Sequence, residues 1–83
     1  MNGDNQRTRE FVQPSAADAE MRTILNSVYE SLKQKGYDPI NQLVGYIVSE
    51  DPTYITNYNN ARALIRKIDR DVLLSTLLRY YLK

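Results

Sequence analysis

The sequence predicts an all-α protein, a compact bundle of about four to five short helices that follows a disordered N-terminal tail. Apolar residues recur at spacings of three and four through most of residues 15–83, which is the period of an amphipathic helix. Aspartate–proline pairs mark two further helix starts. A chain of 83 residues holds one domain at most, so these helices are expected to share one core.

Residues 1–14 (MNGDNQRTREFVQP) form the predicted tail, and residues 15–83 form the predicted helical, dimerising domain. The tail is polar and charged, and it buries too little apolar surface to offset the entropy of ordering it. Phe11 is its one candidate anchor. The tail lacks the apolar core of a signal peptide, and no apolar run nears the roughly 20 residues that span a bilayer. A cytoplasmic protein without membrane insertion is therefore expected.

The first helix is predicted over residues 15–34. Ser15 is a suitable N-cap, and Asp18 follows three residues later as in a capping box. Gly36 supplies the left-handed residue at which such a helix ends. One apolar stripe runs along the helix and consists of Met21, Ile24, Leu25, Val28, Tyr29 and Leu32.

A second helix is predicted to start at Asp38-Pro39, where the aspartate caps and the proline occupies the first helical position. Gly45 lies inside this helix at a cost of about 1 kcal/mol relative to alanine, which indicates the close approach of another helix. Its inward residues are Ile40, Leu43, Val44, Ile47 and Val48.

Asp51-Pro52 repeats the start signal and predicts a short helical turn at residues 53–55, followed by an Asn-rich connection. A helix is expected from about residue 60 to residue 68. Asp69 or Asp71 then caps a last helix that runs to about Leu82. Because the apolar period is nearly unbroken from Ala61 to Tyr81, the pattern leaves open whether these are two helices or one bent helix.

The composition argues against most catalytic and metal chemistry. The chain has neither cysteine nor histidine, so it lacks thiol chemistry, the commonest zinc ligand and the usual general base at neutral pH. Helix capping explains the carboxylates of Asp38 and Asp51, and no acidic pair has the ligand count of a calcium site. No enzymatic activity, metal or cofactor is expected.

Arg62, Arg66 and Arg70 recur every four residues and form a candidate anion-binding or partner-binding site, because guanidinium groups pair with carboxylate and phosphate. The simpler interpretation is a solvated helix face interleaved with acidic residues. A helix-turn-helix DNA-binding regulator is the alternative function. It normally needs a basic balance, whereas the net charge here is only +1, so nucleic acid is not the expected partner.

Seven tyrosines and a widened apolar surface on the last helix favour a homodimer, because a small core cannot cover so many apolar faces. Tyr46, Tyr80 and Tyr81 are the candidate interface residues. Thr8 stands in the charged tail three residues before Phe11, which is a weak signal taken alone.

The stretch KGYDPINQLVGYIVSEDPTYI, residues 35–55, closely resembles the IreB family of small regulatory phosphoproteins of low-GC Gram-positive bacteria. The resemblance extends over about residues 20–83, and Thr8-Arg9-Glu10-Phe11 fits the family's T-x-x-F tail motif. Glu50 departs from the family pattern, which has glycine before Asp51-Pro52.

This resemblance implies a non-enzymatic, all-helical cytoplasmic homodimer. It implies phosphorylation of Thr8 by a transmembrane Ser/Thr kinase that senses the cell wall, recognition through Phe11, and reversal by the cognate phosphatase. It also implies negative regulation of cephalosporin resistance and envelope stress through a downstream protein that the sequence does not name.

Overall fold

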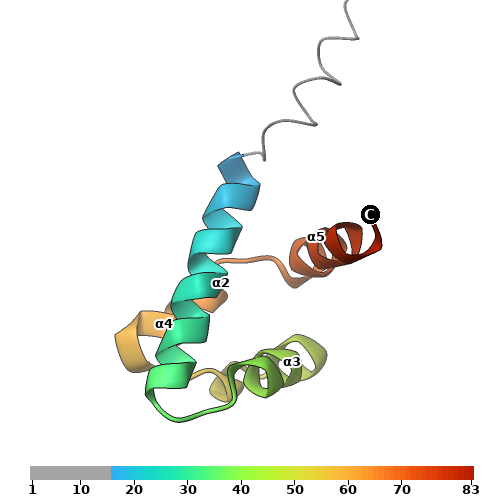
Figure 1. Cartoon of the computed structure of the whole chain (residues 1–83). Coiled ribbons are helices and arrows are strands. Elements are labelled where there is room, and N and C mark those ends of the chain that lie inside the picture. The colour runs from blue at the N-terminus through green and yellow to red at the C-terminus, as the bar shows by residue number, and fades with distance from the viewer. Residues whose placement is uncertain (1–15) are drawn as a thin grey trace, which may run out of the picture.

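The computed structural model of the protein describes residues 16–83, and this part of the chain is all helical, as predicted. The expected tail, residues 1–14, lies outside the described residues. Within the described part, four α-helices and two 3-10 turns follow one another without a strand (Figure 1). Their bounds are α2 Ala16–Gln34, α3 Pro39–Ser49, η1 Pro52–Tyr54, η2 Tyr58–Asn60, α4 Ala61–Ile65 and α5 Arg70–Leu82.

Helix α2 is the longest element; in Figure 1 α3 and α5 extend to one side of it, and α4 crosses it to the other. It ends as its sequence predicts, because Gly36 adopts a left-handed φ of 85°. The amide of Tyr37 then donates to the carbonyl of Leu32 at 3.0 Å, which satisfies a carbonyl at the helix end. The chain can therefore reverse direction and lay α3 against the last turns of α2.

Capping also sets the bounds of α3. The Asp38 carboxylate accepts a hydrogen bond from the amide of Asn41 at 3.3 Å, and Pro39 occupies the first turn. At the other end Glu50 takes the left-handed conformation, with φ 63°, and its amide donates to the carbonyl of Tyr46 at 2.8 Å. The helix thus ends in the conformation that glycine usually supplies, although the residue is glutamate.

The core lies where α2, α3, α4 and the 3-10 turns meet. It contains four residues of the α2 stripe together with Ile55, Ile65 and Leu73 from later in the chain. Leu32, Ile55 and Ile65 are fully buried, so the Asn-rich connection is held in place by Ile55, the apolar residue that precedes it. The complete core set is Met21, Ile24, Val28, Leu32, Tyr46, Ile55, Ala61, Ile65, Ile68 and Leu73.

The last part of the chain forms two helices and not one bent helix. Helix α4 spans five residues and ends at Ile65, whereas the expected helix ran to about residue 68. Asp69 has extended backbone angles, φ −70° and ψ 124°, and its carboxylate accepts from the amide of Asp71 at 3.2 Å. Helix α4 has already ended at Ile65, and this N-cap starts α5. The unbroken apolar period did not reveal the interruption between the two helices.

The close neighbour of Gly45 is an aromatic ring, where a helix was expected. The ring of Tyr54, from η1, lies directly over the Gly45 Cα, and a Cβ at this position would overlap the ring atoms Cε1 and Cδ1. The backbone of Tyr54 is held there because its carbonyl accepts a hydrogen bond from the Gln42 side chain at 2.8 Å.

Candidate functional site

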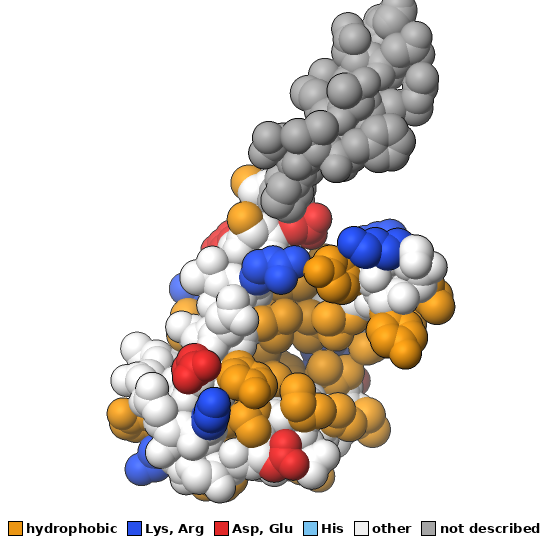
Figure 2. All heavy atoms as spheres, viewed as in Figure 1, with side chains coloured by type: hydrophobic (Ala, Val, Ile, Leu, Met, Phe, Trp, Pro, Cys, Tyr) orange, Lys and Arg blue, Asp and Glu red, His pale blue; other side chains and the backbone are white. Residues whose placement is uncertain are grey.

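Exposed apolar side chains are the most extensive surface feature of the described residues. Four of them on α5 share one helix face by their spacing: Leu74, Leu77, Leu78 and Tyr81, which we call the α5 row. A second set on α3 has the spacing of one face: Ile40, Val44 and Val48, which we call the α3 row. Figure 2 shows hydrophobic side chains gathered where α2, α3 and α5 meet. Contiguous apolar surface of this kind marks protein-binding sites on soluble proteins.

The α5 row is exposed because helix α5 contributes little to the core. Leu73 is its one buried residue, whereas Tyr81 is 85% exposed. The apolar residues of α5 are distributed almost all around the helix, which is typical of a helix covered on more than one side. In the single chain Leu73 is buried and Thr76 is half-buried, whereas Leu74, Leu77, Leu78 and Tyr81 stay exposed and are available to a partner.

The three candidate interface tyrosines are not equivalent. Tyr46 is only 6% exposed and belongs to the chain's own core, so it is not available to a partner as the interface assignment requires. The expectation that Ile40, Val44 and Val48 face inward is wrong, because these side chains are between 52% and 78% exposed and the face of α3 that contains Tyr46 is the buried one. Tyr80 and Tyr81 are exposed on α5. The Tyr80 ring lies 5.7 Å from Arg22 Cζ of α2 and 4.5 Å from Lys83 Nζ, which are distances of cation–π contacts.

Arg62, Arg66 and Arg70 do not share a helix face, because α4 ends before Arg66 and α5 begins at Arg70. Arg62 Nε donates to the carbonyl of Ile55 at 2.8 Å and ties α4 to the preceding connection. Arg66 is exposed and forms no ion pair with any residue in the described part of the chain. Arg66 is therefore the most accessible of the three guanidinium groups for an anion.

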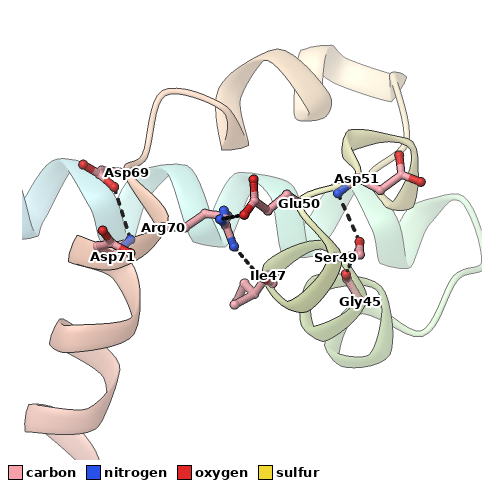
Figure 3. A network of polar contacts seen from close by, with 8 residues as sticks. All are labelled: Gly45, Ile47, Ser49, Glu50, Asp51, Asp69, Arg70 and Asp71. Carbon is pink, nitrogen blue, oxygen red and sulfur yellow. Dashed lines mark hydrogen bonds and ion pairs between the residues drawn. The ribbon is translucent and has the colours of Figure 1, made fainter.

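Arg70 joins the start of α5 to the end of α3 (Figure 3). Its Nη1 donates to the carbonyl of Ile47 at 2.6 Å, and its Nη2 forms an ion pair with Glu50 Oε2. The Arg70 side chain is 27% exposed and the Glu50 side chain 69%, so the Arg70 end of the pair is the better shielded. The left-handed backbone of Glu50 brings its carboxylate into this position, a role that sequence reasoning missed because the partners lie 20 residues apart. The one sequence signal was a glutamate where the family pattern has glycine.

Asp51 stabilises the turn between α3 and η1. Its carboxylate accepts hydrogen bonds from the Thr53 amide at 3.0 Å and the Thr53 hydroxyl at 2.7 Å. The hydroxyl bond, then the amide bond, hold the pKa of Asp51 below its ordinary value, and the charge of Arg62 adds to the effect. Capping therefore accounts for this carboxylate, as the aspartate–proline pair predicts.

Thr8 and Phe11 lie outside the described residues. Within residues 16–83 there is no group of three or more acidic, cysteine or histidine side chains placed to hold a metal ion. No helix of this part is both long and apolar enough to cross a lipid bilayer.

The fold and its surface define a class, a small all-α protein whose main surface feature is apolar. Its sequence relationships identify the family. The chain belongs to the IreB regulatory phosphoprotein family, whose model matches residues 6–83. It is 53% identical over 76 residues to a UPF0297 protein of Ruminiclostridium cellulolyticum, an overlap of 92% of this chain and 86% of that relative. The family resemblance seen in the sequence is thus confirmed.

Proposed function

We propose that the protein is a non-enzymatic, cytoplasmic regulatory phosphoprotein that a transmembrane Ser/Thr kinase phosphorylates on Thr8 and a cognate phosphatase resets. In this proposal it restrains cephalosporin resistance and the envelope stress response by binding a downstream protein. The observation that carries the proposal is the family match, because it begins at residue 6 and so includes the Thr8-x-x-Phe11 motif.

The described threonines support Thr8 as the phosphoacceptor, because their hydroxyl oxygens are bonded or buried. The Thr23 hydroxyl donates to the carbonyl of Ala19 at 3.1 Å, and the Thr53 hydroxyl donates to Asp51. The Thr56 hydroxyl oxygen accepts from the amide of Tyr58 at 3.2 Å, and Thr76 Oγ1 is buried. A kinase needs an extended, accessible acceptor, and none of these four supplies one.

Phosphate transfer by the cognate kinase tests the acceptor. Thr8→Ala should abolish incorporation, whereas the matched control Thr53→Ala should retain it, and phosphopeptide mapping should place the phosphate on Thr8. In cells, Thr8→Ala should change cephalosporin susceptibility where Thr53→Ala does not. Full incorporation of phosphate into Thr8→Ala would end the proposal.

We further propose that the protein acts as a homodimer through the α5 row. The support is the exposure of Leu77 and Tyr81 on a helix that the single chain leaves largely uncovered. Small domains without disulfides or metals commonly gain stability by such association. Arg66 is the proposed contact for an acidic or phosphorylated partner, with Arg62 and Arg70 beside it in sequence.

The alternative, a DNA-binding regulator, rests on a basic stripe of Arg62, Arg66 and Arg70, and these residues do not lie on one helix. Helix α5 does not replace that stripe. The exposed face of α5 is apolar, whereas a helix that reads the major groove presents polar and basic side chains. Titration with duplex DNA at increasing salt separates the two functions. A DNA reader should lose affinity steeply with salt, and the proposed adaptor should show no specific duplex binding.

A further inference from the structure

A second apolar feature lies on the opposite side of the first turn of α5 from the α5 row. It is a groove of about 190 Å³ between the first half of α2 and the connection from α4 to α5. Met21, Ile24 and Ile68 form its floor and are nearly buried. Ala17 and Val72 form its walls, and Val72 remains 46% exposed. The groove is smaller than the roughly 300–1,000 Å³ of sites for drug-sized ligands, so its scale suits one side chain.

We propose that this groove binds the side chain of Phe11 from the same chain. Fifteen residues precede Ala16, the first residue of α2, and the next residue, Ala17, is one wall of the groove. Phe11 is the only phenylalanine of the protein and the largest apolar side chain of that segment. Burying one aromatic ring removes about 150–250 Å² of surface from water, which is the main gain available to this segment.

The chain length permits this docking. Phe11 lies five positions before Ala16, and an extended chain spans at most about 3.3–3.6 Å per residue, so Phe11 reaches up to about 17 Å from the start of α2. The lining of the groove along α2 runs from Ala17 to Ile24, which are seven positions apart, or about 10 Å of helix. The segment can therefore turn back at Pro14 and lie along the groove.

Charge complementarity supports the same occupant. The rim of the groove has two acidic groups, Glu20 and Asp69, and one basic group, Lys67. The residues before Phe11 are two arginines and a glutamate around Thr8, in the order Arg7, Thr8, Arg9 and Glu10. When Phe11 is in the groove, the two arginines face the acidic groups of the rim and the glutamate faces its lysine. These exposed contacts orient the segment more than they strengthen its binding.

Phosphorylation of Thr8 should control the docking of Phe11, and this step rests on the proposed function. A phosphate on Thr8 adds about −1.5 to −2 charges between Arg7 and Arg9. It compensates both arginines and is repelled by Glu20 and Asp69. The unmodified segment therefore binds the groove, and the phosphorylated segment leaves it and uncovers Val72. Phe11 is then an internal anchor as well as a candidate kinase contact.

Methyl NMR spectroscopy of the full chain tests the docking, and the single phenylalanine makes its ring signals unambiguous. Ring-to-methyl cross-peaks are expected from Phe11 to Ile24, Ile68 and Val72, independent of protein concentration. Val72→Lys should abolish them, because it places a positive charge beside Arg7 and Arg9. The matched control Ser75→Lys adds the same charge to α5 outside the groove and should keep them.

Several results would overturn the inference. Absence of the cross-peaks together with unchanged groove methyl shifts in Phe11→Ala would show that Phe11 is not bound. Cross-peaks that vanish on dilution would assign the groove to a second copy. Phosphorylation of Thr8 should remove the cross-peaks, and their persistence would reject the release step. Kinase assays on the same samples report the proposed function separately, since Thr8 can accept phosphate whether or not Phe11 docks.

Discussion

Gly45 of α3 and Tyr54 of η1 are in direct contact, with the tyrosine ring in the space that a Cβ at position 45 would need. Glycine in the middle of a helix costs about 1 kcal/mol relative to alanine. The contact offsets this cost, because the ring of Tyr54 closes over α3 and fixes η1 beside it. The packing of η1 against α3 therefore requires that residue 45 has no side chain.

The first prediction concerns this contact. Gly45→Leu should lower the free energy of unfolding by about 1–3 kcal/mol, because the new side chain must displace the Tyr54 ring. Urea denaturation of both proteins measures the change. A double-mutant cycle gives the control: in a Tyr54→Ala background, Gly45→Ala should stabilise by up to about 1 kcal/mol through helix propensity alone. Equal effects of Gly45→Ala in both backgrounds would show that the ring does not constrain position 45.

The second prediction separates the backbone of Glu50 from its ion pair with Arg70. Glu50→Ala and Glu50→Gly both remove the carboxylate, but only alanine keeps a side chain in the left-handed conformation. Glu50→Gly should therefore be the more stable variant by about 1 kcal/mol in chemical denaturation. Identical stabilities would mean that α3 ends differently in solution.

Arg70 gives the third prediction. Arg70→Ala should cost about 1–3 kcal/mol of unfolding free energy, because it leaves the Ile47 carbonyl without its donor and detaches the start of α5. Arg66→Ala is the matched control and should change stability by less than about 0.5 kcal/mol, because Arg66 is exposed. A loss in Arg66→Ala equal to that in Arg70→Ala would contradict the structural role assigned to Arg70.

The fourth prediction is a pH dependence. The pKa of Asp51 is lowered from 3.8 in the folded state, so the unfolded chain binds the proton more readily. The stabilisation is therefore complete above pH 3.8 and is lost as the pH falls through the folded pKa. Asp51→Asn should show a shallower decrease of Tm below that pH than the unmodified protein. Parallel Tm curves would assign the acid sensitivity to other carboxylates.

The fifth prediction concerns association. Tyr81→Asp should weaken self-association by at least about tenfold in Kd, since a charge in the α5 row opposes burial of Leu77 and Leu78. Sedimentation equilibrium measures this change. Tyr37→Asp is the control, because Tyr37 is also exposed but lies in the turn after α2. If the unmodified protein is a monomer at high micromolar concentration, the homodimer proposal is wrong.

The local part of this structure was predictable from sequence. Gly36 and Asp38 act within four residues of their own positions, so the end of α2 and the start of α3 follow from capping rules. The sequence offers Asp69 or Asp71 as the cap of the last helix, and the structure uses Asp69. The end of α4 at Ile65 was not predictable, because the apolar period continues past it. Contacts between distant parts of the chain could not be predicted from the apolar period either. The period does not say whether an apolar residue faces the core, as Tyr46 does, or remains exposed, as Tyr81 does.

Helix α5 carries two surfaces, because Val72 in its first turn lines the groove while Leu77 and Tyr81 belong to the exposed row. A rigid rod that is held at Arg70 transmits any tilt from one surface to the other. Binding equilibria connected in this way obey reciprocity: if occupation of the row changes the affinity of the groove by some factor, occupation of the groove changes the affinity of the row by the same factor. A modification near one end of the chain would thus alter assembly at the other end without touching it.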